Sequence, residues 1–289
     1  MQVRYRLKAY DLLECLSCGF RAIPYLDNEE EPKPFTEAEV RRSEIYAKTH
    51  LEGSKERLAA LVNVLTDNVP GGSVLDVGCG GGHFIAAISD QYQAEGIELS
   101  PVWHEISRRR GIPVTNHPLQ AAFWDDRAET FDAITLWDVI EHVNCPKDVV
   151  KAAHNLLKTG GKLLMDTPSR DGLLYRFGDL TTALSGGRYP TTLGIQYRPT
   201  PYDHKQIFRV KDMRRMLEEV GFKVQIVTKT ELSMPVAFYL KFLLGSDALA
   251  KLTAPLASAV LWALPLRNKM IVVAAKEPFK SKNHSTTSA

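Results

Sequence analysis

One stretch, SVLDVGCGGGHF at residues 73–84, constrains the fold of this chain more than any other. Ser73 to Val77 form an apolar run too short for a helical period, and glycines follow at once at positions 78, 80, 81 and 82. Apolar spacing suited to a helix resumes at Phe84. The stretch predicts a strand, a tight turn and a helix, and such a turn lets a ligand approach bare backbone and unpaired helix amides.

The spacing of these glycines matches neither common nucleotide fingerprint. The pattern G-x-G-x-x-G would need glycine where this chain has His83, and the Gly-Lys-Ser/Thr ending of a P-loop is absent. Asp76 lies two residues before the first glycine, where a carboxylate favours a positively charged ligand over a pyrophosphate. The turn therefore predicts a site for a cationic ligand, with a tight connection that binds nothing as the alternative.

A second acid extends this site. Glu98 stands at the carboxyl end of a predicted strand at 94–99, 22 residues after Asp76. In a doubly wound sheet, an acid at that position accepts hydrogen bonds from both hydroxyls of a ribose. Asp76 and Glu98 together predict a ligand that is cationic and carries a ribose.

Polar and aromatic side chains follow another predicted strand, 131–136. Trp137, Asp138, Glu141 and His142 come directly after it, at the edge where open parallel sheets carry their reactive groups. Asp138, Glu141 and His142 are spaced i, i+3 and i+4, which is one face of a helical turn. The remaining predicted strands are 111–115, 162–167, 222–227 and 270–275.

The motifs on these strands resemble a known family. VLDVGCGGGHF resembles motif I of the class I S-adenosylmethionine (SAM)-dependent methyltransferases, and residues 131–169 resemble the branch that includes the ubiquinone-biosynthesis O-methyltransferases. The resemblance implies an α/β fold with a Rossmann-like, doubly wound sheet of seven strands in the order 3-2-1-4-5-7-6 and added helices. It implies SAM as cofactor, bound by Asp76, Gly78, Gly80, Gly82, Glu98, Leu99, Trp137 and Asp138.

The implied reaction is an in-line displacement at the methyl group of a sulfonium. Because the leaving group is already activated, the protein chiefly positions donor and acceptor. We expect the acceptor to be a hydroxyl of a small molecule or lipid-linked metabolite, with His142 and Glu141 as the catalytic residues. His142 has an unperturbed pKa suited to a general base, although it could instead only hydrogen-bond within its loop. A SAM-binding partner protein without catalytic activity is the alternative function.

A divalent metal is a further hypothesis. Asp138, Glu141 and His142, with His204 about sixty residues later, resemble the acid-x-x-Glu-His…His metal sites of some methyltransferases that act on vicinal hydroxyls. This chain has Asp where the first acid of that pattern is usually Glu. A metal there would act as a Lewis acid and orient the acceptor oxygens.

Composition limits the partners and the compartment. The 36 basic and 34 acidic side chains leave a net charge of +2, so nucleic acid is not favoured as a partner. The first fifteen residues contain no secretory signal, and the apolar region 252–266 is too short and proline-broken for a membrane span. Four cysteines suggest reduced thiols. We expect a cytoplasmic protein, with peripheral contact to the inner face of the membrane as a further hypothesis.

The chain divides into four predicted parts. Residues 1–35 form an arm and linker in which Cys15 and Cys18 make one zinc knuckle, so the arm resembles half a zinc ribbon and is expected to pack without metal. Residues 36–68 form a helical cap with Lys55 to Arg57 on its outer face. Residues 69–278 form a methyltransferase domain, with an irregular acceptor loop at 169–208 and a helical insertion at 235–266 that extends the core or receives a lipid-like acceptor. Residues 279–289 form a disordered tail.

Overall fold

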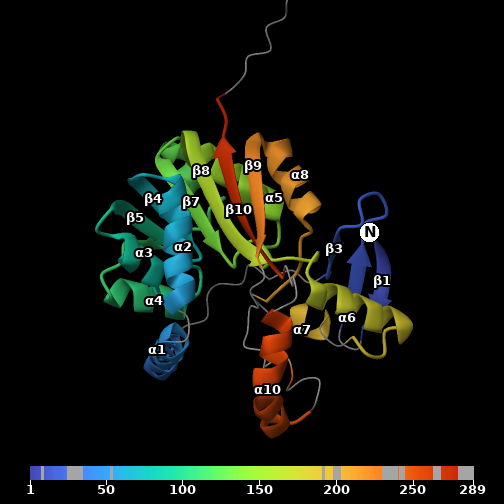
Figure 1. Cartoon of the computed structure of the whole chain (residues 1–289). Coiled ribbons are helices and arrows are strands. Elements are labelled where there is room, and N and C mark those ends of the chain that lie inside the picture. The colour runs from blue at the N-terminus through green and yellow to red at the C-terminus, as the bar shows by residue number, and fades with distance from the viewer. Residues whose placement is uncertain are drawn as a thin grey trace, which may run out of the picture.

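A computed structural model describes the chain in nine stretches (Figure 1). They are residues 1–7, 10–24, 35–52, 55–190, 193–197, 203–229, 240, 245–262 and 268–278. A seven-stranded sheet occupies the centre, and a separate three-stranded sheet lies at the amino-terminal end of the chain.

The central sheet has the order β6-β5-β4-β7-β8-β10-β9, which is 3-2-1-4-5-7-6 in chain order and confirms the prediction. Strands β6, β5, β4, β7 and β8 run parallel, and β10 runs antiparallel to both of its neighbours. The strands are β4 (Gly72–Val77), β5 (Tyr92–Ile97), β6 (Val114–Thr115), β7 (Phe131–Trp137), β8 (Leu157–Pro168), β9 (Phe222–Lys229) and β10 (Lys269–Lys276). Strand β6 is shorter than predicted, because Gly111 has a φ of +73° and Pro113 has no amide hydrogen to donate.

Helices cover both faces of this sheet. On one face, α2 (Lys55–Asn68) and α3 (His83–Ile88) pack on Val74 and Ala133. On the other, α5 (Pro146–Leu156) and α8 (Val210–Val220) pack on Leu75 and Ile134. Because neighbouring residues of a strand point to opposite faces, β4 and β7 contribute apolar side chains to a separate hydrophobic core on each face of the sheet. The remaining elements of this part are α1 (Glu37–Glu52), α4 (Pro101–Arg109) and the 3₁₀-helix η1 (Ala122–Arg127).

The amino-terminal arm is an antiparallel sheet. Its strands β1 (Gln2–Arg6), β2 (Asp11–Glu14) and β3 (Arg21–Ala22) pair in that order. Cys15 and Cys18 lie in the turn between β2 and β3, where the Gly19 amide donates to the Cys15 carbonyl at 2.8 Å. Both cysteines are free thiols.

The region predicted as an irregular acceptor loop contains two helices, α6 (Leu173–Leu184) and α7 (Leu193–Gln196). The expectation of irregular structure over 169–208 was therefore wrong for these residues. Helix α6 buries Tyr175, Gly178 and Thr182, which follow an i, i+3, i+7 spacing. Glycine and threonine have low helix propensity, and their presence on the buried face hides the helical period in the sequence.

Part of the predicted carboxyl-terminal region lies outside the described residues. Of the insertion at 235–266, the structure describes helix α10 (Asp247–Trp262) and residues 240, 245 and 246. The predicted tail at 279–289 is not among the described residues. Among the helices that are described, none combines the length and the apolar character needed to cross a membrane.

The turn after β4 depends on glycine at position 82. Gly82 has a φ of +71°, and a Cβ atom there would lie 2.6 Å from Cγ1 of Ile112. Gly160 has a similar φ of +84° but open space around it, so it serves as a matched control. We expect Gly82→Ala to lower the free energy of unfolding by about 1–3 kcal/mol more than Gly160→Ala, because it adds a steric clash to the same backbone strain. Urea denaturation of both variants measures the difference, and equal losses would contradict it.

Candidate active site

The glycine turn leaves its backbone open at the carboxyl edge of the sheet. Gly78 and Gly80 have φ values of +72° and +54°, a conformation that other residues rarely adopt. A Cβ at Gly78 would lie 2.7 Å from Cγ2 of Val139, so this glycine also permits close contact with the segment after β7. At Gly80, no atom of the described residues other than Gly80 and its two chain neighbours lies within 4 Å of the corresponding position. A ligand can therefore approach the main chain at Gly80.

Glu98 joins this turn to the end of β5. Its Oε2 accepts a hydrogen bond from the Gly80 amide, and its Oε1 accepts one from the Ser100 amide, each at 2.8 Å. Burial raises the pKa of Glu98, and the two amide bonds oppose that effect. The next residue, Leu99, is 43% exposed, so a carboxylate and an open apolar surface stand together just past the strand. This is where the sequence analysis placed them.

Asp76 lies beneath the turn. Its side chain is buried, and its Oδ1 accepts a hydrogen bond from the Thr135 hydroxyl on β7 at 2.6 Å. Burial, partly opposed by this hydrogen bond, raises the pKa of Asp76 to about 7. Among the described residues, no basic side chain forms an ion pair with it. The carboxylate would therefore be stabilised by a cationic ligand group nearby.

Asp138 belongs to a partly buried network of four charges, of which Asp166 and Lys269 are buried and Arg57 and Asp138 are partly exposed. Lys269, at the start of β10, donates to Asp138 at 2.6 Å and to Asp166 on β8 at 3.0 Å. Arg57 of α2 donates to the same two carboxylates at 2.6 and 2.9 Å. Burial would raise the pKa of Asp138, but the adjacent charges of Lys269 and Arg57 lower it below its usual range. Asp138 also has a positive φ of 53°.

Arg57 and Lys269 were not predicted from the sequence as residues of the site. Arg57 was assigned to the outer face of the helical cap, but its guanidinium reaches the carboxyl edge of the sheet and is 40% exposed. Lys269 begins the last strand and has no motif around it. Asp166 could have been found, because it stands near the carboxyl end of a predicted strand, as Glu98 does.

Three of the four predicted metal candidates come together. Oε1 of Glu141 lies 3.8 Å from Nε2 of His142 and 4.0 Å from Nε2 of His204. Glu141 is fully buried, and its Oε2 accepts a hydrogen bond from Thr167 at 2.9 Å. Nδ1 of His204 lies 2.9 Å from the Gln196 carbonyl oxygen, which can only accept a hydrogen bond. Nδ1 therefore carries the ring proton, and Nε2 is unprotonated with a free lone pair. The fourth candidate, Asp138, lies instead between Arg57 and Lys269.

The charge state of this cluster suits a cation. Burial, and secondarily the charge of Asp138, raises the pKa of Glu141. Burial, and secondarily His142, lowers the pKa of His204 to about 4, so this imidazole is neutral at pH 7. A neutral imidazole and a carboxylate deprived of solvent are ligands that a divalent cation would stabilise.

Buried polar atoms without a protein partner gather at the same edge. They are Nε1 of Trp137, Nε of Arg57, Oε1 of Glu141, Nδ1 of His142 and Oδ1 of Asp166, and each has no hydrogen-bond partner among the described residues. Such atoms are uncommon in folded proteins and call for a ligand or water. The residues at this edge therefore fit a polar cofactor, and Glu141 with the two histidines fits a metal ion.

The cysteines of the arm do not complete a metal site within the described residues. There, the cluster of Glu141, His142 and His204 is the one group of three or more His, Cys, Asp or Glu side chains whose ligand atoms lie within 4.8 Å of one another. Cys15 and Cys18 have no third donor in that part of the chain. The resemblance of the arm to half a zinc ribbon thus remains a prediction.

The sheet order, the glycine turn after the first strand and the acid after the second define a class I SAM-dependent methyltransferase. The model of the methyltransferase domain family matches residues 50–227, and the chain belongs to this family. It is thus a member of a family of enzymes whose cofactor is SAM, and its methyl acceptor is not determined by this match.

Individual relatives are distant. The chain is 28% identical over 164 residues to the ubiquinone biosynthesis O-methyltransferase of Pseudomonas syringae, a match that covers 55% of this chain and 67% of that protein. A SAM-dependent methyltransferase from Archaeoglobus fulgidus superposes with a TM-score of 0.52 at 14% identity, over 77% of this chain and 94% of the other. Phosphoethanolamine N-methyltransferase 2 of Haemonchus contortus, in complex with SAM, superposes with a TM-score of 0.50 at 15% identity, over 77% and 52%. The structural matches establish the fold.

The raised pKa of Asp76 makes stability depend on pH. Between its unfolded pKa of 3.8 and its folded value of about 7, the folded protein keeps a proton that the unfolded chain has released. The carboxyl group therefore costs stability as pH rises through this window, and the full cost remains above it. We expect Asp76→Asn to raise the free energy of unfolding by about 1–3 kcal/mol at pH 8 and by little at pH 4.

Urea denaturation of the ligand-free protein at pH 4, 6 and 8 tests this prediction. Asparagine keeps an acceptor for the Thr135 hydroxyl, so the variant isolates the charge. A variant less stable than the wild type at pH 8 would mean that Asp76 is held ionised by a favourable interaction.

Proposed function

We propose that this enzyme transfers the methyl group of SAM to a hydroxyl oxygen of a small-molecule or lipid-linked metabolite. The observation that carries the choice of oxygen is the cluster of the buried Glu141 with the half-buried His142 and His204 at the carboxyl edge of the sheet. A carboxylate and two imidazoles can take a hydroxyl proton or hold a cation that polarises the hydroxyl. The similarity to proteins named as ubiquinone biosynthesis O-methyltransferases supports the same choice.

On the donor side, the residues divide by charge. Glu98 would accept the ribose hydroxyls, and Leu99 and Trp137 would cover apolar parts of the cofactor. The main chain at Gly80 allows a close approach, while its amide donates to Glu98. Asp76 favours the ammonium group through its charge. The guanidinium of Arg57 bonds both acids through one terminal nitrogen and is 40% exposed, so its other terminal nitrogen is suited to donate to the carboxylate of the methionine moiety. SAM itself supplies an electrophilic methyl group and a neutral thioether as leaving group.

On the acceptor side, two mechanisms use the same residues. In the first, His142 removes the hydroxyl proton as the oxygen attacks, and Glu141 stabilises the imidazolium 3.8 Å away. In the second, Glu141, His142 and His204 hold a divalent cation, which would supply Lewis-acid polarisation of the acceptor oxygen. The unprotonated Nε2 of His204 favours the second, because a ligand nitrogen must be free of its proton.

The lipid-linked form of this proposal includes peripheral contact with the inner face of the membrane. It is supported by exposed apolar side chains on two helices beyond the carboxyl edge of the sheet (Figure 1). They are Phe177, Leu180 and Leu184 on α6, and Leu249, Leu252 and Leu256 on α10. Exposed apolar stripes of this size mark contact surfaces in soluble proteins.

The decisive experiment for the reaction is incubation with methyl-labelled SAM and a metabolite extract, followed by identification of the labelled product. An O-methylated product supports the proposal. An N- or C-methylated product would overturn the choice of oxygen. Calorimetric binding of SAM without label transfer would favour the alternative, a SAM-binding protein that acts as a partner of another enzyme.

The metal mechanism predicts that exhaustive chelation abolishes methyl transfer and that Mn²⁺ or Zn²⁺ restores it. His204→Ala should lower metal affinity about 100-fold or more, because it removes one of three protein ligands. His154→Ala, on α5, is the matched control and should leave affinity unchanged. Metal titration and a transfer assay measure both quantities. Full activity after chelation would leave His142 acting as the base without a metal.

The donor-side assignment predicts that Arg57→Met weakens SAM binding by about tenfold or more, since it removes a charge-assisted hydrogen bond. Lys55→Met, two residues before Arg57 at the exposed start of α2, should leave the affinity unchanged. Isothermal titration calorimetry with SAM compares the two variants. If Arg57→Met lowers only thermal stability, the guanidinium serves solely to neutralise Asp138 and Asp166.

A further inference from the structure

The amino-terminal arm shares a core with the acceptor side of the enzyme. Leu7, Leu12 and Ile23 of the arm are buried against Tyr175 of α6. The same cluster includes Leu193, Tyr197 and Ile207, all from the region predicted as an acceptor loop. This core is separate from the two that cover the central sheet. The arm is therefore packed on the elements that surround His204.

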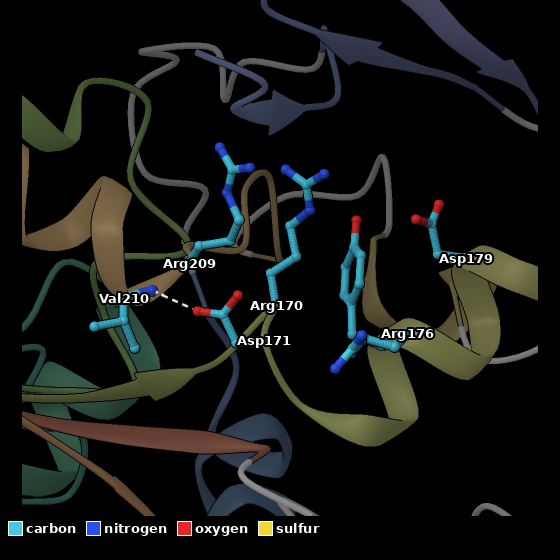
Figure 2. A pocket seen from close by; sticks show the side chains of 7 residues that line it. Arg170, Asp171, Arg176, Asp179, Arg209 and Val210 are labelled. Carbon is cyan, nitrogen blue, oxygen red and sulfur yellow. Dashed lines mark hydrogen bonds between the residues drawn. The ribbon is translucent and has the colours of Figure 1, made fainter.

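Polar clamps fix the arm in this position. Arg170 donates to the carbonyl of Gly19 at 2.6 Å, and Arg209 donates to the carbonyl of Cys18 at 2.5 Å. Figure 2 shows both guanidinium groups extending toward the arm from a cavity of about 540 Å³. From the arm, Arg21 and Tyr5 both reach the carboxylate of Asp179 on α6, each at 2.7 Å. Because both arginines bond to main-chain carbonyls, they hold this turn independently of the identity of its side chains.

Strand β3 continues the contact into the candidate site. Ala22 forms an antiparallel bridge with Gln206, and the amide of Ile23 donates to the carbonyl of Lys205 at 2.9 Å. The segment 204–206 is thus joined to the edge of the arm by an isolated bridge. His204 is the first residue of this segment.

The other side of this segment supports the turn that carries Glu141 and His142. The side-chain amide of Gln206 donates to the carbonyls of Ile140 at 3.1 Å and Val143 at 2.8 Å. The amide of Lys205 donates to the Glu141 carbonyl at 3.0 Å, and the ammonium of Lys205 donates to the His142 carbonyl. Gln206 is 4% exposed, so losing its donors would remove this partner from the buried carbonyl of Ile140 and the partly buried carbonyl of Val143.

We propose that the arm, residues 1–24, is a positioning element for the acceptor side of the active site and that it acts through Gln206. The arm holds segment 204–206, and Gln206 in turn fixes the Glu141–His142 turn opposite His204. The inference rests on the proposed function for its catalytic consequence and on contacts alone for its structural part. In this proposal, the turn that carries Cys15 and Cys18 is the place where Arg170 and Arg209 bind the arm.

Gln206→Met tests the connection directly, because methionine keeps the length of the side chain and removes both donors. We expect amide hydrogen exchange in residues 139–143 to become about tenfold faster while exchange in the glycine turn at 78–82 stays unchanged. We also expect kcat for methyl transfer to fall about tenfold with the dissociation constant of SAM within twofold of the wild type. Gln225→Met, on the exposed side of β9, is the control and should change none of these quantities.

Arg170→Met tests the arm without changing any residue of the turn that carries Glu141 and His142. It removes the bond to Gly19 and should give the same pattern as Gln206→Met in smaller degree: faster exchange at 139–143, lower kcat and unchanged SAM affinity. Exchange that is unchanged at 139–143 in both variants would overturn the proposal. Exchange that accelerates equally in the glycine turn would also overturn it, because a general loss of stability would then explain the effect. If the wild type transfers no methyl group, the proposed function fails while the exchange data still decide the role of the arm.

Discussion

The contact between two carboxylates and two cations is the interaction on which the candidate site depends. Asp138 stands directly after β7 and Asp166 near the end of β8, and the two carboxylates would repel each other in this partly buried position. Lys269 and Arg57 each bridge both acids, so the four charges sum to zero and tie together β7, β8, β10 and α2. Residues 137–142, which carry the remaining site residues, start from this network.

Glu141 shows what happens to an acid near this network without a cation of its own. It is fully buried, three residues after Asp138, and its hydrogen-bonding partner is the neutral hydroxyl of Thr167. Its second oxygen faces two imidazoles instead of a fixed positive charge. The protein thus places one neutralised acid toward the donor side and one acid open to further chemistry toward the acceptor side.

Local patterns predicted the sheet and the places of the glycine turn and the acids at strand ends, because those features are encoded within a few residues. The glycine turn and Glu98 each follow a strand, Asp76 stands near the end of β4, and the strand order implied by the family resemblance is confirmed. The helical structure of residues 173–184 was missed because glycine and threonine lie on its buried face. The assignment of Asp138 to the metal candidates overlooked Lys269, which is 131 residues away in sequence and adjacent only after folding. Arg57 was read as a solvent-facing residue because a helix surface gives no sign of what lies above it.

The reversed direction of β10 determines which end of this strand supplies a site residue. In the parallel strands, the carboxyl end lies at the reactive edge; in β10, the first residue does, and this is why Lys269 arrives there. Strands β7 and β8 bring the acids Asp138 and Asp166 to this edge near their carboxyl ends, so a cation that neutralises both can come from the start of an antiparallel neighbour. One reversed strand thus supplies positive charge where the parallel strands supply negative charge.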